Sequence, residues 1–262
     1  MQKVNIKRFK KVLVANRGEI AIRVYRALNE LGIQTIGIFS KEDKYSLFRT
    51  KTDEAYMLDK EKGPIDAYLD IQEIIHIAKT KGADAIHPGY GFLSENPEFV
   101  EACEKAGIAF IGPSKEVMYA MGDKISSKQI AIKCNVPIIP GVDHAVKSEE
   151  EVMKIAQQVG YPVMLKASNG GGGRGMRIVN SAQEMPKEFE EARNEAKKAF
   201  GDDKIFIEKY LKNPKHIEVQ VLGDKYGNVV HLFDRDCSVQ RRHQKVVEYA
   251  PASTISNETR EK

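Results

Sequence analysis

Apolar residues follow two different spacings in turn through residues 1–122 of the chain. Short apolar runs, typical of buried strands, alternate with stretches whose apolar residues recur three and four positions apart, as in helices. The runs predict strands at 11–15, 33–39, 55–58, 83–86 and 108–111. The helical spacing predicts helices at 18–31, 71–78 and 97–106. Strands that alternate with helices indicate a parallel sheet covered on both faces, so we expect an α/β, Rossmann-like, doubly wound domain.

The pattern changes after a predicted helix at 126–134, where two prolines and a glycine within 137–141 are typical of a linker. A new helix is expected to open at Ser148, because Glu151 three residues later completes a capping-box pattern. The sequence beyond it predicts strands at 161–167, 176–179, 205–210, 217–222 and 229–233, and a charged helix at 184–200. The composition of residues 223–228 predicts a hairpin between the last two strands.

Composition narrows the class of protein. The 262 residues are 42% hydrophobic and 30% charged, as in an ordinary soluble globular protein. The net charge of +4 is small and scattered, which argues against a nucleic-acid partner. The three cysteines are far apart, which favours free thiols in a reducing compartment. No apolar run approaches the roughly 18 residues of a membrane span, so we expect a cytoplasmic protein without membrane contact.

A glycine-rich loop is the strongest local signal for chemistry. Residues 170–173 are four consecutive glycines, and Lys166 stands at the end of the preceding strand. Such a loop lets backbone N–H groups approach phosphate oxygens, and the lysine adds a positive charge. A strand follows the loop, whereas a dinucleotide-binding fingerprint requires a helix there. The segment therefore predicts an ATP-grasp type of lid over a triphosphate, with a merely flexible hairpin tip as the alternative.

Three further polar groupings are weaker when taken singly. Glu208 lies on a strand edge that could bind an adenine rim, although a Glu-Lys pair on a strand is usually a solvated face. Alternation places His216, Glu218 and Gln220 on one face of a strand, which is also the pattern of any amphipathic strand. The basic cluster within 241–245 suits an anion, or is an exposed basic loop.

The loop at 87–96 follows a parallel strand, at the edge where open α/β sheets place ligands. For His87 itself we favour packing against a neighbouring domain over a catalytic role.

Six motifs in order resemble those of the biotin carboxylase family, across essentially the whole chain. They are residues 15–21, 87–96, 121–124, 166–176, 208–209 and 235–245. Other ATP-grasp ligases, such as carbamoyl-phosphate or purine-pathway enzymes, have a similar glycine-rich lid but are expected to lack the motif at 235–245 with this sequence. A different class of alternative is a non-catalytic fragment that only binds nucleotide or another subunit.

The resemblance implies a site, residue by residue. Lys245 matches the catalytic lysine that binds bicarbonate. The positions that match ATP-binding residues are Lys124, Lys166, Gly172, Gly173, Glu208, Lys209, Tyr210, Leu211, His216, Gln240 and His243. The acidic metal ligands of the family match nothing in this chain, so we expect no metal ligand within residues 1–262. A fixed cation beside the γ-phosphate would collect the carbonate anion and offset charge as carboxyphosphate forms.

The resemblance also implies domains and partners. The expected parts are an N-terminal domain at 1–122, a linker helix and loop at 123–142, an ATP-grasp lid at 143–208 and the start of the C-terminal ATP-grasp subdomain at 209–262. The implied ligands and cofactors are ATP, Mg or Mn, bicarbonate, and biotin on a carrier domain absent from this chain. The implied assembly is a homo-oligomer.

Within that family, residues 40–47, 53–56 and 67–69 resemble the pyruvate carboxylase branch more than the stand-alone subunit of acetyl-CoA carboxylase, which remains the alternative. That branch passes the carboxyl group from biotin to pyruvate and forms oxaloacetate. Residues 257–262 have the pattern of a helix cap and first turn, which predicts that the chain is a fragment. We expect the fragment alone to be inactive in biotin carboxylation, and the lid at 143–208 to be mobile.

Overall fold

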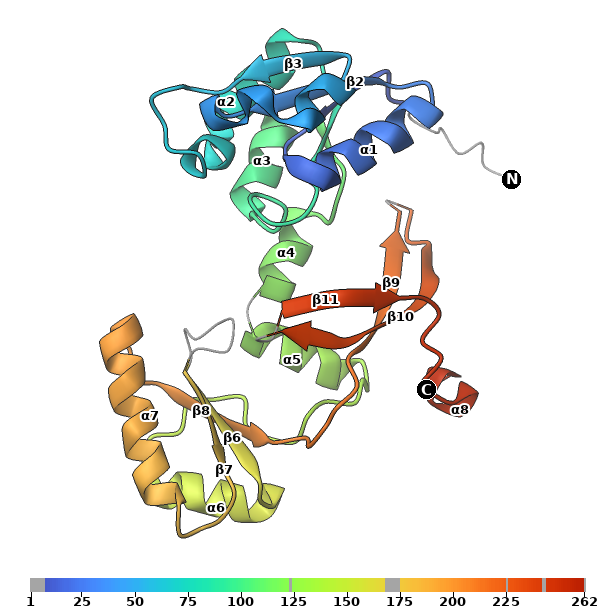
Figure 1. Ribbon diagram of the computed structural model, residues 1–262. Helices are drawn as coiled ribbons and strands as arrows, with labels where there is room; N and C mark the ends of the chain where they lie inside the picture. The colour runs from blue at the N-terminus through green and yellow to red at the C-terminus, as the bar shows by residue number, and fades with distance from the viewer. Residues whose placement is uncertain (1–7, 123, 168–174, 225, 242–243, 262) are drawn as a thin grey trace. The chain divides into compact units, whose positions relative to one another are not determined.

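The computed structural model describes residues 8–122, 124–167, 175–224, 226–241 and 244–261. The chain divides into two compact units, Met1–Ser127 and Lys128–Lys262 (Figure 1). The finer boundaries at 122, 142 and 208 stay predictions. No helix in these described ranges is both long enough and apolar enough to cross a membrane.

The first unit contains a parallel sheet of five strands in the order β3-β2-β1-β4-β5. Its strands are β1 (Lys11–Val14), β2 (Gln34–Phe39), β3 (Glu54–Met57), β4 (Ala85–His87) and β5 (Ala109–Phe110). All five strands that the sequence predicted are present. This order, with the first strand in the middle, is that of a Rossmann-like doubly wound sheet.

Both faces of this sheet are buried. Leu13 and Ile38 contribute to a core on one face with helices α2 (Ile71–Thr80) and α3 (Pro97–Lys105), while Val12 and Val14 pack on the other with α1 (Gly18–Glu30). Neighbouring residues of a strand point to opposite faces, so one strand serves both cores. The doubly wound prediction is confirmed (Figure 1).

Four elements of this unit were not predicted. They are α4 (Lys115–Gly122) and the 3₁₀ helices η1 (Lys41–Tyr45), η2 (Leu47–Lys51) and η3 (Asp66–Leu69). Helix α4 is short and buries only Met118, while its other large apolar residues Val117, Tyr119 and Met121 are exposed. The linker helix that follows, α5 (Lys124–Lys133), agrees with the predicted helix at 126–134.

The second unit begins with a small antiparallel sheet covered by two helices. Strands β7 (Met176–Val179), β6 (Val163–Ala167) and β8 (Ile205–Lys209) lie in that order. Helices α6 (Glu149–Val159) and α7 (Met185–Phe200) pack against it through Val152, Ala156, Met185 and Phe189, which are buried. Ser148 caps α6 by accepting a hydrogen bond from the N–H of Glu151, as the capping-box pattern predicted.

The segment predicted as a linker also joins this sheet. Backbone N–H groups of Val142 and Val146 donate to Ile207 and Ile205 over 3.2 and 2.8 Å, and Lys209 N–H donates to the Pro140 carbonyl over 2.7 Å. Residues 140–146 thus run antiparallel along β8 as an irregular outer strand. The sheet of β7, β6 and β8 is called the lid sheet below, and a movement of it would carry residues 140–146 with it.

The rest of the second unit is an antiparallel sheet of β9 (Ile217–Gly223), β10 (Val229–Arg241) and β11 (Gln244–Tyr249), followed by α8 (Asn257–Glu261). The hairpin between β9 and β10 is confirmed. The predicted strand at 229–233 was too short, and β11 was not predicted. The exposed-loop interpretation of the basic cluster is therefore wrong for Arg241 and Lys245, which lie on paired strands.

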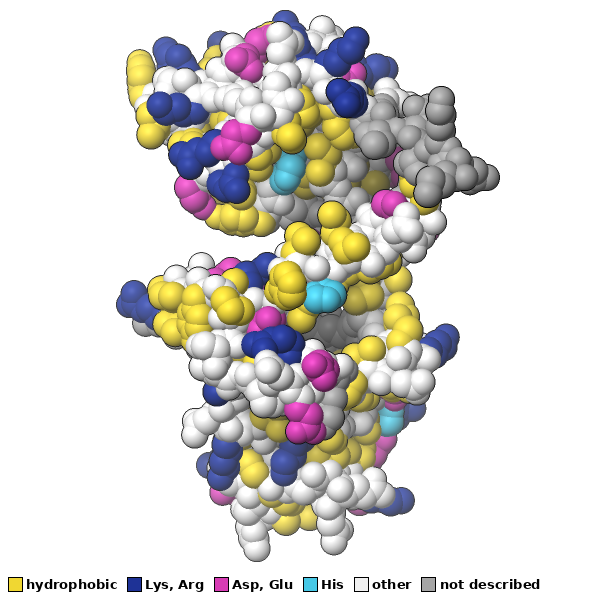
Figure 2. Space-filling model, turned by 90° about the vertical axis from the view of Figure 1, so that its right-hand side faces the viewer, with side chains coloured by type: hydrophobic (Ala, Val, Ile, Leu, Met, Phe, Trp, Pro, Cys, Tyr) yellow, Lys and Arg dark blue, Asp and Glu magenta, His cyan; other side chains and the backbone are white. Residues whose placement is uncertain are grey.

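Hydrophobic side chains are visible at the molecular surface in Figure 2. On β9 and β10, exposed apolar residues include Val219, Val221, Leu222, Val229, Val230 and Leu232. Apolar residues at alternate positions had predicted a strand with one buried face. The alternation is present, but in this chain the apolar face of β9 is itself exposed.

We predict that Gly141→Ala loosens the contact between residues 140–146 and β8. A Cβ atom at this position would lie 2.5 Å from the carbonyl oxygen of Ile207 and 2.9 Å from Cα of Glu208, and backbone cannot move aside cheaply. Overpacking of this kind costs about 1–3 kcal/mol. Hydrogen exchange of β8 amides should accelerate and the urea midpoint should fall.

Gly223→Ala is the matched control, because its Cβ would meet nothing closer than 3.9 Å. Equal stability and equal β8 protection in the two variants would contradict the proposed close contact.

Candidate active site

The lid sheet brings two of the predicted nucleotide-binding residues together. Lys166 on β6 and Glu208 on β8 form an ion pair, with Nζ and Oε2 2.5 Å apart. Their neighbours Leu165 and Ile207 point into the core, so the pleat directs the two charged side chains to the other face. An ammonium and a carboxylate therefore stand side by side on one face of the lid sheet, with parts of both side chains in contact with solvent.

Lys209, which the resemblance assigns to the adenine-binding edge, uses its side chain for a contact within the chain. Its ammonium donates hydrogen bonds to the carbonyls of Gly160 and Tyr161 over 2.7 and 3.0 Å. Gly160 is the C-cap of α6, and a cation there also opposes the negative end of the helix dipole. The side chain thus ties β8 to α6. Any contact of Lys209 with a nucleotide is left to its backbone carbonyl, because its N–H is bonded to Pro140.

Several predicted residues cannot be placed against this pair. Gly172, Gly173 and His243 lie outside the described residues, as does the side chain of Lys124. Tyr210 N–H donates to the carbonyl of Pro162 over 3.1 Å, and Leu211 is exposed.

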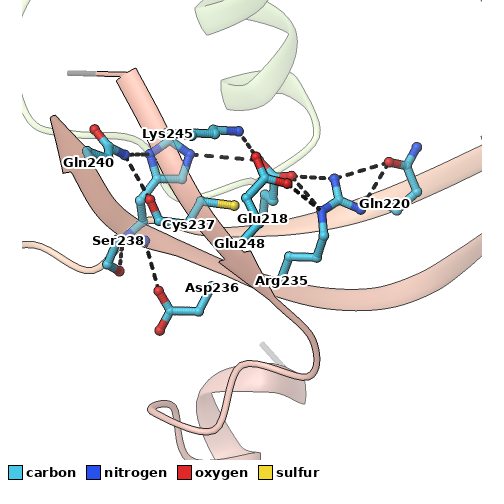
Figure 3. A network of polar contacts seen from close by, with 10 residues as sticks. Glu218, Gln220, Arg235, Asp236, Cys237, Ser238, Gln240, Lys245 and Glu248 are labelled. Atoms are coloured by element: carbon cyan, nitrogen blue, oxygen red, sulfur yellow. Dashed lines mark hydrogen bonds and ion pairs between the residues drawn. The ribbon is translucent and has the colours of Figure 1, made fainter. Parts of the chain in front are cut away.

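A second polar group lies on the sheet of β9, β10 and β11 (Figure 3). The Glu218 carboxylate stands between two cations. Its Oε1 accepts hydrogen bonds from Nε of Arg235 over 2.8 Å and from Nη2, and its Oε2 accepts one from the Lys245 ammonium. Gln220 accepts from the same guanidinium over 3.3 Å. Three strands thus supply one continuous network.

The charged groups in this network shift one another's pKa values. Hydrogen bonding from Lys245, and then from Arg235, lowers the pKa of Glu218 to about 2. The same hydrogen bond raises the pKa of Lys245. Burial raises the pKa of the Cys237 thiol beside them, and the negative charges of Glu218 and Glu248 raise it further. At neutral pH this face therefore carries an anchored ammonium, a carboxylate and a protonated thiol.

His216 and Gln240, both predicted to contact nucleotide, are neighbours here. The Gln240 side-chain amide lies 3.1 Å from Nδ1 of His216 and donates to the carbonyl of Cys237 over 3.0 Å. His216 N–H donates to Ser238 Oγ over 2.9 Å. The structure thus brings together Gln240 on β10, Lys245 on β11 and His216, which directly precedes β9, with Glu218 beside them.

The opposite side of β10 is supported by a buried carboxylate. Asp236 is 1% exposed and accepts hydrogen bonds from Ser238 N–H, Tyr249 OH and Thr254 Oγ1 over 2.9, 3.0 and 2.7 Å. These bonds, led by those from Ser238 and Thr254, lower the pKa of Asp236. Figure 3 shows Asp236 pointing away from Glu218 and Lys245. It fixes the backbone that carries Cys237 without joining the charged face.

The acidic groups on this sheet do not fit a magnesium ion. Within the described residues, Glu218, Cys237 and Glu248 have ligand atoms within 4.8 Å of one another. Magnesium prefers oxygen ligands in an octahedron, and a buried thiol is a poor member of that set. Glu218 is also already neutralised by two cations. We therefore assign no magnesium ligand to these residues.

The carboxyl edge of the first-unit sheet has its own polar groups. Asn16 donates to the carbonyls of Pro88 and Tyr90 over 2.7 and 2.8 Å, and Gly89 N–H donates to Nδ1 of His87 over 3.0 Å. Burial lowers the pKa of His87. These contacts give the 87–96 loop a fixed shape within its own unit.

Arg17 was missed by the sequence reasoning at this edge. Its Nε and Nη2 donate to the buried carboxylate of Asp43 over 2.6 and 2.5 Å, and Tyr68 OH donates to the same group over 2.8 Å. Arg235 lies within the motif at 235–245, but the sequence reasoning assigned it no role of its own. Only the spacing of Glu218 and Gln220 on one strand face pointed to a shared partner.

Comparison with known proteins identifies the family. Residues 8–118 match the family model for the biotin carboxylase N-terminal domain, and residues 123–262 match that for the ATP-binding domain of the carbamoyl-phosphate synthase L chain. The chain belongs to the biotin carboxylase family of ATP-grasp proteins. Among curated relatives, it is 58% identical over 251 residues to pyruvate carboxylase of Bacillus subtilis and 51% identical over 260 residues to the mitochondrial human enzyme.

The chain spans 22% of the length of these relatives, while they align with 96% and 99% of it. Solved structures are similar too. The biotin carboxylase domain of Hydrogenobacter thermophilus 2-oxoglutarate carboxylase, a dimer in complex with MgADP, ADP and bicarbonate, matches with 54% identity and a TM-score of 0.85 over 98% of this chain and 56% of that one. Rhizobium etli pyruvate carboxylase matches with 54% identity and a TM-score of 0.80 over 97% of this chain and 23% of that one.

We predict that Lys209→Met weakens the junction of β8 and α6. The substitution keeps an unbranched side chain but removes hydrogen bonds from a charged donor, which contribute about 1.5–3 kcal/mol. The lid sheet should unfold at lower urea concentration, and amides at the end of α6 should exchange faster. Lys154→Met on the exposed face of α6 is the control. If both variants unfold alike, the ammonium does not hold the junction.

A second prediction concerns acid titration of Glu218. A carboxyl whose pKa falls from 4.5 to about 2 on folding stabilises the folded state above pH 4.5 and loses that effect as the pH falls through about 2. Carbon-13 NMR of the Glu218 carboxyl should show this depressed titration, and Lys245→Gln should move it back toward 4.5. Titration of the wild-type group near 4.5 would refute the ion-pair geometry.

Proposed function

We propose that the chain supplies part of the active site of a biotin carboxylase. ATP activates bicarbonate to carboxyphosphate, with release of ADP, and the carboxyl group then passes to biotin on a carrier domain, with release of phosphate. The observation that carries this proposal is the Lys245 ammonium, which is fixed by Glu218 on the same sheet as His216 and Gln240. A fixed cation of this kind can hold a small anion and offset charge that develops at a phosphoryl group.

The lid sheet supports the nucleotide part of the proposal. Triphosphate competes with Glu208 for the ammonium of Lys166, and the released carboxylate can accept a hydrogen bond from the exocyclic amine of adenine. The 2.5 Å ion pair therefore couples phosphate binding at Lys166 to adenine binding at Glu208. Tyr210 and Leu211 continue the strand edge beside it. Lys124, Gly172, Gly173 and His243 complete the proposed ATP site by resemblance alone.

Magnesium or manganese would accompany the nucleotide and neutralise phosphate charge. The described acidic residues near Lys245 do not fit that ion, so we assign none of them as its ligand. Our assignments to this chain are limited to binding and orientation. Lys245 holds bicarbonate, Lys166 attracts phosphate, and Glu218 keeps the ammonium of Lys245 in place.

For the final acceptor we propose pyruvate, which would give oxaloacetate. The curated pyruvate carboxylases at 50–58% identity support this choice. A second acceptor is favoured by a specific observation, since a 2-oxoglutarate carboxylase domain is 54% identical, as is Rhizobium etli pyruvate carboxylase. A biotin carboxylase from Campylobacter jejuni is also similar, at 48% identity and a TM-score of 0.86, and the stand-alone subunit remains the alternative. Purified enzyme assayed with both oxoacids distinguishes the acceptors.

Assembly and location are part of the proposal. The dimeric Hydrogenobacter domain supports a homo-oligomer. We expect a cytoplasmic protein, and the curated relatives include bacterial and mitochondrial enzymes.

We predict that Lys245→Ala in the full-length carboxylase nearly abolishes bicarbonate-dependent ATP cleavage. Loss of a hydrogen-bonded charge contact at a reacting anion costs several kcal/mol, so a decrease of about a hundredfold or more is expected. The measurement is ADP release with and without bicarbonate in the presence of free biotin. Lys154→Ala on the outer face of α6 is the control for loss of a surface lysine. Turnover of Lys245→Ala within a few-fold of wild type would rule out the assignment.

A further inference from the structure

Arg235 is the residue that holds the other end of the Glu218 carboxylate. It lies on β10, opposite Glu218 on β9, in register across the antiparallel pair. Nε and Nη2 both donate to Oε1 of Glu218, the first over 2.8 Å. The ammonium of Lys245 bonds only the second oxygen, Oε2. The two cations therefore use opposite oxygens of one carboxylate.

The guanidinium is itself held in one orientation. Gln220 Oε1 accepts from Nη1 and Nη2 over 3.3 Å, and Oε2 of Glu248 lies 3.9 Å from Nε. A guanidinium is planar, so acceptors on two of its edges define the direction of its donors. The guanidinium of Arg235 is therefore fixed in orientation by acceptors from the two neighbouring strands, β9 and β11.

Lys245 needs such a support because its own side chain is long and flexible. About a third of it is exposed, at 37%. Ordering a lysine side chain costs up to about 2 kcal/mol of rotamer entropy, and a fixed partner offsets that cost. Glu218 can be a fixed partner only if its carboxylate is prevented from rotating. Among the described contacts, Arg235 makes the bonds that prevent it.

The guanidinium also balances charge on this face. The charged groups that face one another are Glu218 from β9, Arg235 from β10, and Lys245 and Glu248 from β11. His216 stands at the margin, with Nε2 3.9 Å from Glu218 Oε2. Without Arg235, two carboxylates would face a single ammonium, and the site would repel a small anion.

We propose that Arg235 is a positioning residue for anion binding: it clamps Glu218 so that the Lys245 ammonium is presented to bicarbonate in one place. The proposal rests on the proposed function for the identity of the anion. The clamp itself is a claim about this chain alone, and it can be tested without any assay of activity.

The decisive measurement is the pH dependence of acetylation of Lys245 by acetic anhydride, followed by mass spectrometry in the full-length carboxylase. The variants are Arg235→Gln and Arg235→Lys. If Arg235 positions Glu218, its loss frees the carboxylate, and the raised pKa of Lys245 falls toward the ordinary value of 10.5. Below that pH, acetylation of Lys245 then accelerates about three- to tenfold, because only the neutral amine reacts.

If the role of Arg235 were purely electrostatic, Arg235→Gln would change the acetylation rate of Lys245 in the opposite direction. Removing a positive charge while Glu218 stays in place would raise the pKa of Lys245 further and slow its acetylation. A lysine at position 235 restores the charge without the planar fork, so Arg235→Lys should be intermediate. Slower acetylation in Arg235→Gln, or a wild-type result for Arg235→Lys, would overturn the clamp.

Arg260→Gln is the matched control for general destabilisation. Arg260 also pairs with a carboxylate of β10, that of Asp234, but makes no described contact with Glu218. It should lower thermal stability and leave Lys245 acetylation within about twofold of wild type, since its ion pair is separate. If Arg260→Gln changes Lys245 as much as Arg235→Gln does, the effect is general and the proposal is wrong.

Kinetics add a second readout on the same variants. Arg235→Gln should raise the KM for bicarbonate about tenfold or more with a smaller fall in kcat, because the anion site is lost before the chemical step. A fall in kcat alone would contradict anion positioning. If the wild-type protein shows no bicarbonate-dependent ATP cleavage, the proposed function fails, while the acetylation profile still decides whether Arg235 holds Lys245 through Glu218.

Discussion

One carboxylate, that of Glu218, determines the arrangement of the polar face of the β9–β10–β11 sheet. It accepts hydrogen bonds from Arg235 on one strand and Lys245 on another. The two cations bond opposite oxygens of this carboxylate, so loss of either one would remove the charged donor from one oxygen. The positions of Gln220 and Glu248 around the guanidinium follow from this arrangement.

The lid sheet also contains a lysine whose ammonium is paired with a glutamate carboxylate. Lys166 is paired with Glu208 as Lys245 is paired with Glu218, so these two candidate ligand-binding lysines each have a glutamate partner. An anion that binds to either ammonium must therefore compete with a carboxylate for it. This competition favours ligands that carry enough negative charge to share or replace the glutamate.

Backbone contacts set the frame in which these side chains act. The antiparallel bonds between residues 140–146 and β8 fasten the chain that enters the lid onto the lid itself. In the first unit, Asn16 and Asp43 hold the loops at the carboxyl edge of the parallel sheet through hydrogen bonds to backbone and to Arg17. Such edges are where doubly wound sheets place ligands.

The sequence alone determined the alternation of strands and helices, the doubly wound class and the family, because hydrophobic spacing and motif order are local properties of the chain. It also marked Lys245 and Lys166 as candidate ligand-binding residues. The tertiary structure decided what those lysines touch. The contact of Lys209 with α6 joins residues 49 positions apart, while the bond from Arg235 to Glu218 and the pairing of β11 with β10 depend on the register of neighbouring strands. Hydrogen bonds between strands depend on register, and register is settled only when the strands meet.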